Sequence, residues 1–278
     1  MITSKTAKDL SLTAIIPLWS RALESSESKN PLFRDEVAEK VWNESEFLKS
    51  KKQFIVEADK LTKKFTQIEI AIRTHIIDRL VKDIHQENKE AIFLNTGSGL
   101  CTRSSRLGLR ENFIESDTSE GLSLRGHTLG LSSSENCLTI DLNKQFPIGF
   151  IREKTGNKPL NIICEGTLMY FKKERALTLM KDLCKLAGAG GRVIVEVLGK
   201  RGEGVTHPMI KQINPELNYK WGVDKPKTLE SEEVTLVSHH NVWKGYEEKW
   251  GPVSHIVKWW PGGRYSIGSF IAVCSGID

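Results

Sequence analysis

The sequence predicts an α/β fold, in which a mainly parallel sheet carries helices on both faces and follows a helical N-terminal region. Two observations predict it. From residue 90 onward, short apolar strings alternate with polar and glycine-rich connections, a pattern typical of buried strands. Residues 172–187 have the spacing of an amphipathic helix, as a crossover between parallel strands requires. We expect a helical cap over residues 1–88 and a sheet-bearing core over 89–278, with a further cap segment at about 199–232.

The N-terminal region has the apolar spacing of helices. Three segments show it, at residues 33–48, 52–65 and 66–86. The last is the strongest, because apolar residues recur on one face at Ile70, Ile77, Leu80 and Ile84. Arg73 lies on the same stripe. An arginine there usually extends outward to solvent, but it would bind a ligand if an anionic group lay nearby.

The remaining chain predicts the strands of the sheet. We expect them at residues 91–95, 113–116, 137–140, 160–165, 192–198, 234–238 and 265–275. The glycine-rich residues 188–191 would end the crossover helix. Residues 119–134 are rich in glycine and serine and form a poor helix pattern, so their conformation stays open.

Composition narrows the class of protein. Hydrophobic residues make up 39% and charged residues 27% of the chain, which favours a globular protein over a disordered or fibrous one. The lysines of residues 49–65 are interleaved with acids, which indicates a solvated helix face, and we expect no nucleic-acid partner. The sequence has no apolar run of 18 residues, so we expect no membrane span.

Cysteine usage and the first residues suggest a compartment. The five cysteines occur singly, at Cys101, Cys137, Cys164, Cys184 and Cys274. Single, unpaired cysteines favour reduced thiols in a cytoplasmic protein, with no metal site. Residues 1–12 lack the long apolar stretch of a signal peptide, which agrees with this expectation.

Polar residues follow each of the first four predicted strands. The first leads into "NTGSG" at residues 95–99, and acids follow the next three: Asp117, Asp141 and Glu165. Carboxyl ends of parallel strands meet at one edge of a sheet, where ligands bind. An acid 20 residues beyond Gly97 is placed to bind ribose hydroxyls. Asp141 would then reach an adenine amine and Glu165 a cationic group. Each acid alone could be a helix cap, but together they favour a nucleoside-type cofactor.

The spacing of the glycines in this loop distinguishes between two candidate cofactors. A dinucleotide site uses G-x-G-x-x-G, and here Thr102 stands in the place of the third glycine. S-adenosylmethionine carries no phosphate, so it needs a close backbone approach, a ribose acid, and partners for a carboxylate and an ammonium group. Arg73 would supply the partner for that carboxylate. We therefore favour S-adenosylmethionine, and a nicotinamide-dependent oxidoreductase is the alternative.

Several motifs in chain order carry a family resemblance. They are "PLWSRALES" (17–25), "PLFRDEVAEKV" (31–41), "FLNTGSGLCTRSSRL" (93–107), "ESD" (115–117), "TIDL" (139–142) and "CEGTLMYF" (164–171). Together they resemble the leucine carboxyl methyltransferase family, which includes polyketide O-methyltransferases of the tetracenomycin type. The resemblance runs from about residue 12 to the C-terminus.

This resemblance implies a Rossmann-like class I methyltransferase sheet of seven strands with the last strand antiparallel, a helical N-terminal cap, and S-adenosylmethionine as methyl donor. It also implies the donor-binding residues: Arg73 for the carboxylate, the loop Gly97, Ser98 and Gly99 for a backbone cradle, Asp117 for the ribose, Asp141 and Leu142 for the adenine, and Glu165 for the methionine end. The chain departs from the family pattern at Thr96, where leucine is usual, and at Cys101, where aspartate is usual.

The methyl acceptor is less defined. The resemblance implies transfer to a carboxylate or hydroxyl oxygen of a small molecule, polyketide-like or another acid, and a protein C-terminus stays open. A carboxylate needs no general base, whereas a hydroxyl does. We name no compulsory catalytic residue. Candidates for the acceptor side are Arg21 and Tyr170 by resemblance, His207 as a loop base, and Trp221 as an aromatic wall. A relative that binds ligands without catalysis is the second alternative.

Overall fold

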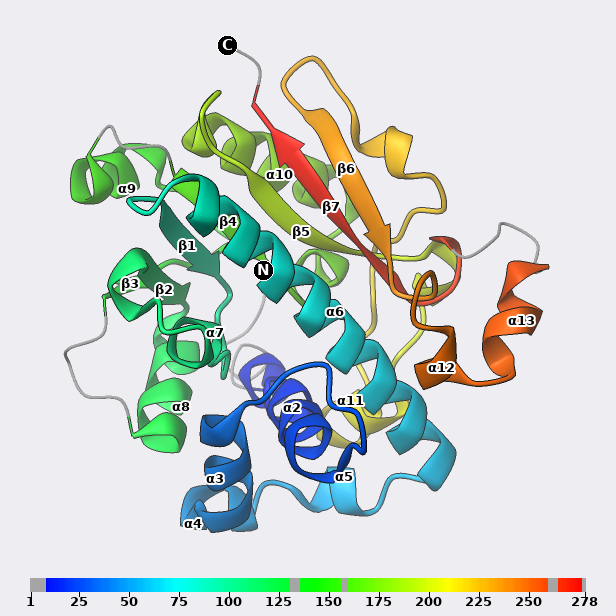
Figure 1. Cartoon of the computed structure of the whole chain (residues 1–278). Coiled ribbons are helices and arrows are strands. Elements are labelled where there is room, and N and C mark those ends of the chain that lie inside the picture. The colour runs from blue at the N-terminus through cyan, green and yellow to red at the C-terminus, as the bar shows by residue number, and fades with distance from the viewer. Residues whose placement is uncertain (1–8, 131–135, 157–159, 260–264, 277–278) are drawn as a thin grey trace.

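A mixed β-sheet forms the centre of the computed structural model, which describes residues 9–130, 136–156, 160–259 and 265–276. Within these residues the sheet has seven strands in the order β3-β2-β1-β4-β5-β7-β6 (Figure 1). The strands are β1 Ile92–Thr96, β2 Phe113–Asp117, β3 Cys137–Thr139, β4 Leu160–Cys164, β5 Val193–Leu198, β6 Thr235–Asn241 and β7 Ser269–Ser275. Among them, β7 alone runs antiparallel to the other six strands. The predicted sheet is confirmed.

Two strand boundaries differ from the expectation by more than one residue. The last strand begins at Ser269 rather than at residue 265, because residues 265–268 form a turn that ends at Gly268 with φ +74°. Strand β6 continues to Asn241, and its register against β7 shifts between Leu236 and Ser238. A β-bulge of this kind inserts an unpaired residue and so lengthens the strand.

The helices surround the sheet. They are α2 Ile15–Glu27, α3 Glu36–Glu44, α4 Glu46–Lys49, α5 Gln53–Val56, α6 Lys60–Glu87, α7 Arg103–Arg106, α8 Ser119–Leu129, α9 Ile148–Thr155, α10 Lys173–Ala187, α11 Pro208–Ile213, α12 Glu247–Trp250 and α13 Val253–Lys258. None of these helices is both long and apolar enough to cross a membrane.

Alternate residues of the central strands β1, β4 and β5 enter two separate cores. On one face, Phe93, Ile163 and Ile194 pack against residues of α6, among them Ile72 and Ile76. On the other face, the strand neighbours of these residues pack against α10 in a second core: Leu94, Ile162 and Val195 with Leu179 and Leu183. This two-residue period is what a strand buried on both faces requires.

The long helix α6 links the sheet to the N-terminal helices. Figure 1 shows it crossing one face of the sheet, with α2, α3 and α5 grouped beside it. The predicted helix at 52–65 is divided, because Asp59 caps α6 by accepting a hydrogen bond from the Thr62 N–H at 2.9 Å. The part of α6 that follows Thr66 supplies the sheet-facing residues, whereas Ile70 belongs to a third core formed with α2 and α11.

The glycine- and serine-rich residues after β2 form a helix at Ser119–Leu129. Capping at both ends explains why this segment is helical. The Thr118 side chain accepts a hydrogen bond from the Gly121 N–H at 3.1 Å, and Gly130 ends the helix with φ +65°. An N-cap threonine and a left-handed C-terminal glycine stabilise both ends of a helix whose interior has low propensity.

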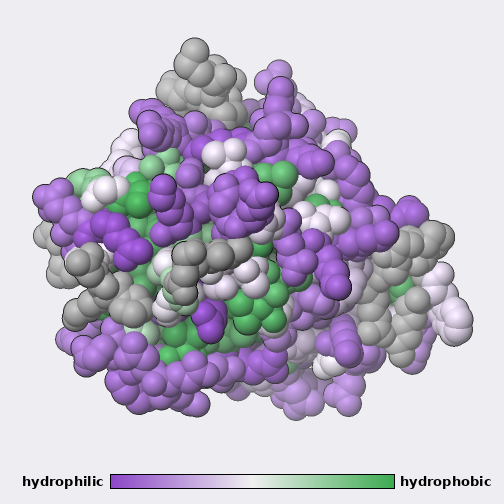
Figure 2. All heavy atoms as spheres, turned by 90° about the horizontal axis from the view of Figure 1, so that it is seen from above, coloured by the Kyte–Doolittle hydropathy of each residue, from purple (hydrophilic) through white to green (hydrophobic). Residues whose placement is uncertain are grey.

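Figure 2 views the molecule from above the orientation of Figure 1. This face is mostly hydrophilic, and hydrophobic side chains show between the polar ones. Such a distribution is ordinary for a protein surface, and we assign no function to it.

Candidate functional site

The carboxyl ends of the parallel strands open into a cavity of about 550 Å³. Eleven of the twelve site residues predicted from the sequence line it: Arg21, Arg73, Gly97, Ser98, Gly99, Asp117, Asp141, Leu142, Glu165, Tyr170 and His207. Trp221 does not. It is buried in the core on the α10 face of the sheet, in the same cluster as Val197 and Phe270. Ligand pockets of drug-sized compounds have volumes of roughly 300–1,000 Å³, so this cavity has the size of a ligand site.

The glycine loop after β1 brings backbone directly to the cavity wall. Gly97 and Gly99 have φ values of +63° and +46°, a region that other residues seldom adopt. A Cβ on Gly97 would stand 2.6 Å from Thr167 Oγ1, and one on Gly99 would stand 2.9 Å from Ala14 Cβ. Both glycines are therefore required by conformation and by space. Between them, the buried hydroxyl of Ser98 has no hydrogen-bond partner among the described residues.

Asp117 fixes the loop from the end of β2. Its Oδ2 accepts from the Gly99 N–H and its Oδ1 from the Thr118 N–H, each at 2.7 Å. Burial raises the pKa of Asp117, and these two N–H groups oppose the rise. Each carboxylate oxygen has a second lone pair, so Asp117 can still accept hydrogen bonds from ligand hydroxyls.

Asp141 and Leu142 form the cavity wall after β3. Asp141 Oδ1 accepts from both the backbone N–H and the side-chain amide of Asn143, each at 2.9 Å. The carbonyl of Leu142 accepts from Arg175 Nη2 at 2.7 Å, which ties this loop to α10. The second oxygen of the Asp141 carboxylate is left to accept from a ligand amine.

Arg73 is held by two carboxylates. Its Nε donates to Glu165 Oε1 at 3.0 Å and its Nη1 to Glu196 Oε1 at 2.9 Å. Among the described residues no partner engages its Nη2. Guanidinium groups bind carboxylates through planar forks, so two nitrogens of Arg73 are fixed and a third is left for an anionic ligand group.

Glu165 lies between two guanidiniums. Besides Arg73, it accepts at Oε2 from Arg103 Nη2 at 2.7 Å. Burial by itself raises the pKa of Glu165, but Arg103 and Arg73 overcome this and lower it to about 2. The carboxylate is therefore ionised at any physiological pH and supplies a fixed negative charge to the cavity.

A buried ion network extends from Glu165 to the N-terminal helices. Arg103, which has no solvent exposure, pairs at Nε with Asp78 of α6 at 2.7 Å. Arg106 pairs with the same aspartate, at 2.6 Å. Cys101 lines the cavity beside this network, and its Sγ accepts from Arg103 Nη1 at 3.4 Å. A buried, fully paired set of charges fixes the helices around the loop, because separating any partner leaves an unpaired buried charge.

Arg21 belongs to the same buried ion network. Its Nε pairs with Asp35 at 2.9 Å and its Nη2 donates to the Leu100 carbonyl at 2.6 Å. The arginine that was predicted to contact the acceptor thus joins α2 to the glycine loop. Thr96, which replaces the usual leucine under the turn, is fully buried and donates to the Ile163 carbonyl at 3.0 Å.

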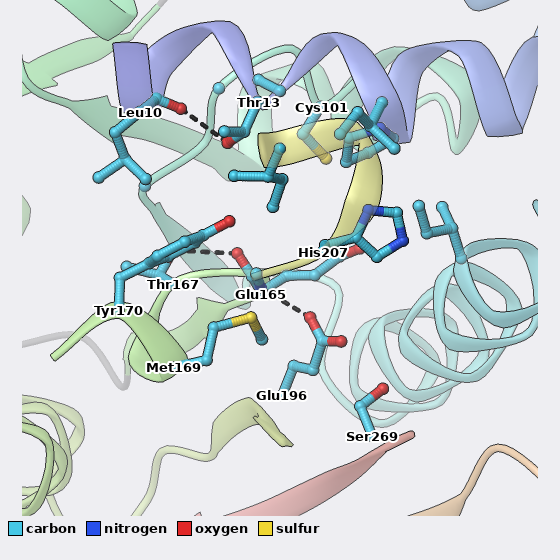
Figure 3. A pocket seen from close by; sticks show the side chains of 18 of the residues that line it. Leu10, Thr13, Cys101, Glu165, Thr167, Met169, Tyr170, Glu196, His207 and Ser269 are labelled. Atoms are coloured by element: carbon cyan, nitrogen blue, oxygen red, sulfur yellow. Dashed lines mark hydrogen bonds between the residues drawn. The ribbon is translucent and has the colours of Figure 1, made fainter. Parts of the chain in front are cut away.

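The part of the cavity away from Asp117 is mainly apolar. It is lined by Leu10, Ile16, Phe65, Ile70, Met169 and Ile210, with polar groups at Thr13, Thr66, Glu69, Tyr170, His207 and Tyr219. Figure 3 shows Tyr170, His207, Glu165 and Glu196 around this space. The cavity therefore has two halves. The polar half, beside the glycine loop, is called the donor half here. The more apolar half, between α2, α6 and α11, is called the acceptor half.

Sequence reasoning missed several residues of the site. Glu69 lies one helical turn before Arg73, and that spacing was visible in the sequence. Glu196 is the single acid within the apolar strand "VIVEVL", which is itself a signal because an unpaired charge does not stay in a buried strand. Arg103 gave no signal, because its partners come from segments 25 and 62 residues away.

The strand order, the antiparallel seventh strand, and a glycine loop facing an acid at the end of the second strand together define a class I methyltransferase fold. The sequence profile of the leucine carboxyl methyltransferase family matches residues 14–184. The chain belongs to this family, and it is an S-adenosylmethionine-dependent methyltransferase by that membership.

Solved structures agree with the fold. A DUF574 family protein from Streptomyces avermitilis superposes with a TM-score of 0.54 at 12% identity, covering 95% of this chain and 96% of that one. A protein from Thermobifida fusca named as a putative methyltransferase superposes with a TM-score of 0.53 at 13% identity, covering 93% of this chain and 94% of that one. At such identities the likeness shows the fold alone. Comparison with curated protein sequences found no match.

Proposed function

We propose that this protein is an O-methyltransferase that transfers the methyl group of S-adenosylmethionine to an oxygen atom of a small molecule. The observation that carries the proposal is that the donor half and the acceptor half belong to one cavity. Methyl transfer is a displacement between two bound reactants, so the protein must hold both in one water-poor space.

The donor half fits S-adenosylmethionine. Asp117 would accept from the ribose hydroxyls, Asp141 with Leu142 would contact the adenine, and the third nitrogen of Arg73 would bind the carboxylate. The glycine loop leaves no room for a Cβ, and the buried Ser98 hydroxyl has no hydrogen-bond partner in the part of the chain that the structure describes. Both features are expected where a ligand approaches a backbone closely.

When bound, S-adenosylmethionine supplies a methyl group on a positively charged sulfur. The residues of this chain position that group and exclude water. Glu165 and Glu196 both line the cavity, and their carboxylate oxygens would face the cationic end of the donor.

Two segments enclose the acceptor half, and we propose that they form a cap. The N-terminal helices contribute Thr13, Ile16 and Phe65, and the segment at 199–232 contributes His207 and Ile210. Met209 and Ile210 of α11 belong to the same core as α2 residues, so the two segments pack together. An acceptor that fits beneath such a cap is a small molecule more readily than a protein C-terminus.

Equilibrium dialysis tests the donor part of this proposal. We expect S-adenosylmethionine and S-adenosylhomocysteine to bind and NADH not to bind. Tight NADH binding without binding of the other two would instead favour a nicotinamide-dependent oxidoreductase.

Product stability tests the oxygen. After incubation with methyl-labelled S-adenosylmethionine and an acceptor, alkaline hydrolysis releases label as methanol from a methyl ester, whereas a methyl ether retains it. Label found only on nitrogen or carbon of the acceptors tested would contradict O-methylation.

A further inference from the structure

Glu69 is an acid of the acceptor half that forms no ion pair among the described residues. It lies on α6 four residues before Arg73, so both side chains project from the same face of the helix. No lysine, arginine or histidine forms an ion pair with Glu69 among the described residues, whereas Glu165 and Glu196 are both paired with Arg73. Across the cavity wall it faces the start of β7, where a Cβ on Gly268 would stand 3.2 Å from Glu69 Oε1.

The charges around Glu69 disfavour an anionic acceptor. Two guanidiniums line the described cavity, those of Arg21 and Arg73. Arg21 is engaged by Asp35 and the Leu100 carbonyl, and Arg73 by two carboxylates. An acceptor carboxylate would therefore lie near Glu69 and Glu196, with no free cation among the described residues of the acceptor half to balance it, and such like-charge contacts are unfavourable.

His207, the base considered from the sequence, has both ring nitrogens occupied. Its Nδ1 must accept from the Met209 N–H at 3.3 Å, because a backbone N–H can only donate. The proton of the neutral ring is then on Nε2, which donates to Thr66 Oγ1 at 3.0 Å. Burial lowers the pKa of His207 to about 4, which keeps the ring neutral. His207 thus positions α11 and has no lone pair left to take a proton.

The two tyrosines of the acceptor half are no better as bases. Burial raises the pKa of Tyr170 to about 12, and burial with the nearby Tyr170 raises the pKa of Tyr219 well above its ordinary value. Both phenols stay protonated at neutral pH. Their rings lie 5.6 Å apart and form an aromatic wall.

We propose that the acceptor is a neutral, largely apolar alcohol or phenol, and that Glu69 is the general base that takes its proton. This inference rests on the proposed methyltransferase function. The acceptor oxygen forms a bond to the methyl carbon while the carbon–sulfur bond breaks and its electron pair stays on sulfur. The hydroxyl proton moves to a carboxylate oxygen of Glu69, and the apolar residues of the acceptor half bind the remainder of the molecule.

The surroundings of Glu69 suit a base at neutral pH. Burial and the neighbouring Glu196 of β5 raise its pKa, while Arg73 of α6 and Ser269 of β7 oppose the rise. Tyr219, from the segment after α11, also faces it. A carboxylate with a raised pKa accepts a proton more readily than an exposed one.

The test compares two probes of the same shape, 2-naphthol and 2-naphthoate, of which only the second is ionised at neutral pH. Calorimetry measures their binding to the protein saturated with S-adenosylhomocysteine. We expect 2-naphthol to bind about tenfold tighter or more, and Glu69→Gln to narrow this gap by improving naphthoate binding. The wild type should methylate 2-naphthol, and Glu69→Gln should slow this by roughly 10²–10⁴-fold.

Matched variants keep the outcomes interpretable. Glu87→Gln removes an exposed acid at the end of the same helix and should change neither binding nor rate. Glu69→Asp keeps the carboxylate and should retain part of the rate, which a purely structural role would not predict. Naphthoate binding as tight as naphthol binding, no binding or methylation of 2-naphthol, or an unchanged rate in Glu69→Gln would each overturn the inference. If S-adenosylhomocysteine itself fails to bind, the proposed function fails instead.

Discussion

The Gly97→Ala substitution adds a methyl group where the backbone turns toward the cavity. Gly97 has φ +63°, a conformation that costs an L-residue about 1–2 kcal/mol. The new Cβ would also stand 2.6 Å from Thr167 Oγ1, which donates to the Glu165 carbonyl at 3.0 Å. Thr167 can rotate away only by losing this hydrogen bond, worth about 1 kcal/mol. We expect Gly97→Ala to lower the free energy of unfolding by about 2–3 kcal/mol.

Urea denaturation measures this loss, and a second glycine separates its two causes. Gly108 has φ +69°, and a Cβ there would meet nothing within 4 Å. Gly108→Ala should therefore lose only the conformational part, about 1–2 kcal/mol. In a Thr167→Ala background, the cost of Gly97→Ala should fall to the same value. Equal losses for Gly97→Ala and Gly108→Ala in the wild-type background would refute the close approach to Thr167.

Three further predictions concern charged and loop residues. Asp117→Ala should weaken binding of S-adenosylhomocysteine by about 1–3 kcal/mol in calorimetry, since it removes a charged hydrogen-bond acceptor, while the exposed Asp224→Ala should not; an unchanged affinity would exclude Asp117 from the site. The pKa of Glu165 is lowered from 4.5 to about 2, so its contribution to stability is complete above pH 4.5 and is lost as the pH falls toward 2. Unfolding at a series of pH values should show this loss in the wild type and not in Glu165→Gln. Cys101 Sγ lies 3.4 Å from Arg103 Nη1, so Cys101→Asp places an acid beside this guanidinium and should change both the melting temperature and the donor affinity. No change in either would show that the family aspartate is dispensable here.

The fold could be predicted because local patterns determine it. Apolar strings bounded by turns gave every strand, and the spacing of residues 172–187 gave α10. The conformation of residues 119–134 could not be decided from glycine and serine content, because the two capping residues Thr118 and Gly130 override low helix propensity over Ser119–Leu129. The break before α6 was missed because the single cap Asp59 interrupts a continuous helical pattern.

The donor half of the site was predictable and the acceptor half was not. Asp117, Asp141 and Glu165 follow successive strands, so chain order alone brings them to one edge of the sheet. The acceptor half depends on how segments from distant parts of the sequence meet. Trp221 therefore lies in a core rather than the cavity, and Arg21, which lines the cavity, also donates a hydrogen bond to the Leu100 carbonyl of the glycine loop.

A crystal structure of the complex with S-adenosylhomocysteine tests the central claim most directly. The account predicts the ribose on Asp117, the adenine beside Asp141 and Leu142, the carboxylate on Arg73, and the sulfur facing the acceptor half that holds Glu69. A complex with the ligand bound outside this cavity, or with the ribose away from Asp117, would contradict the account.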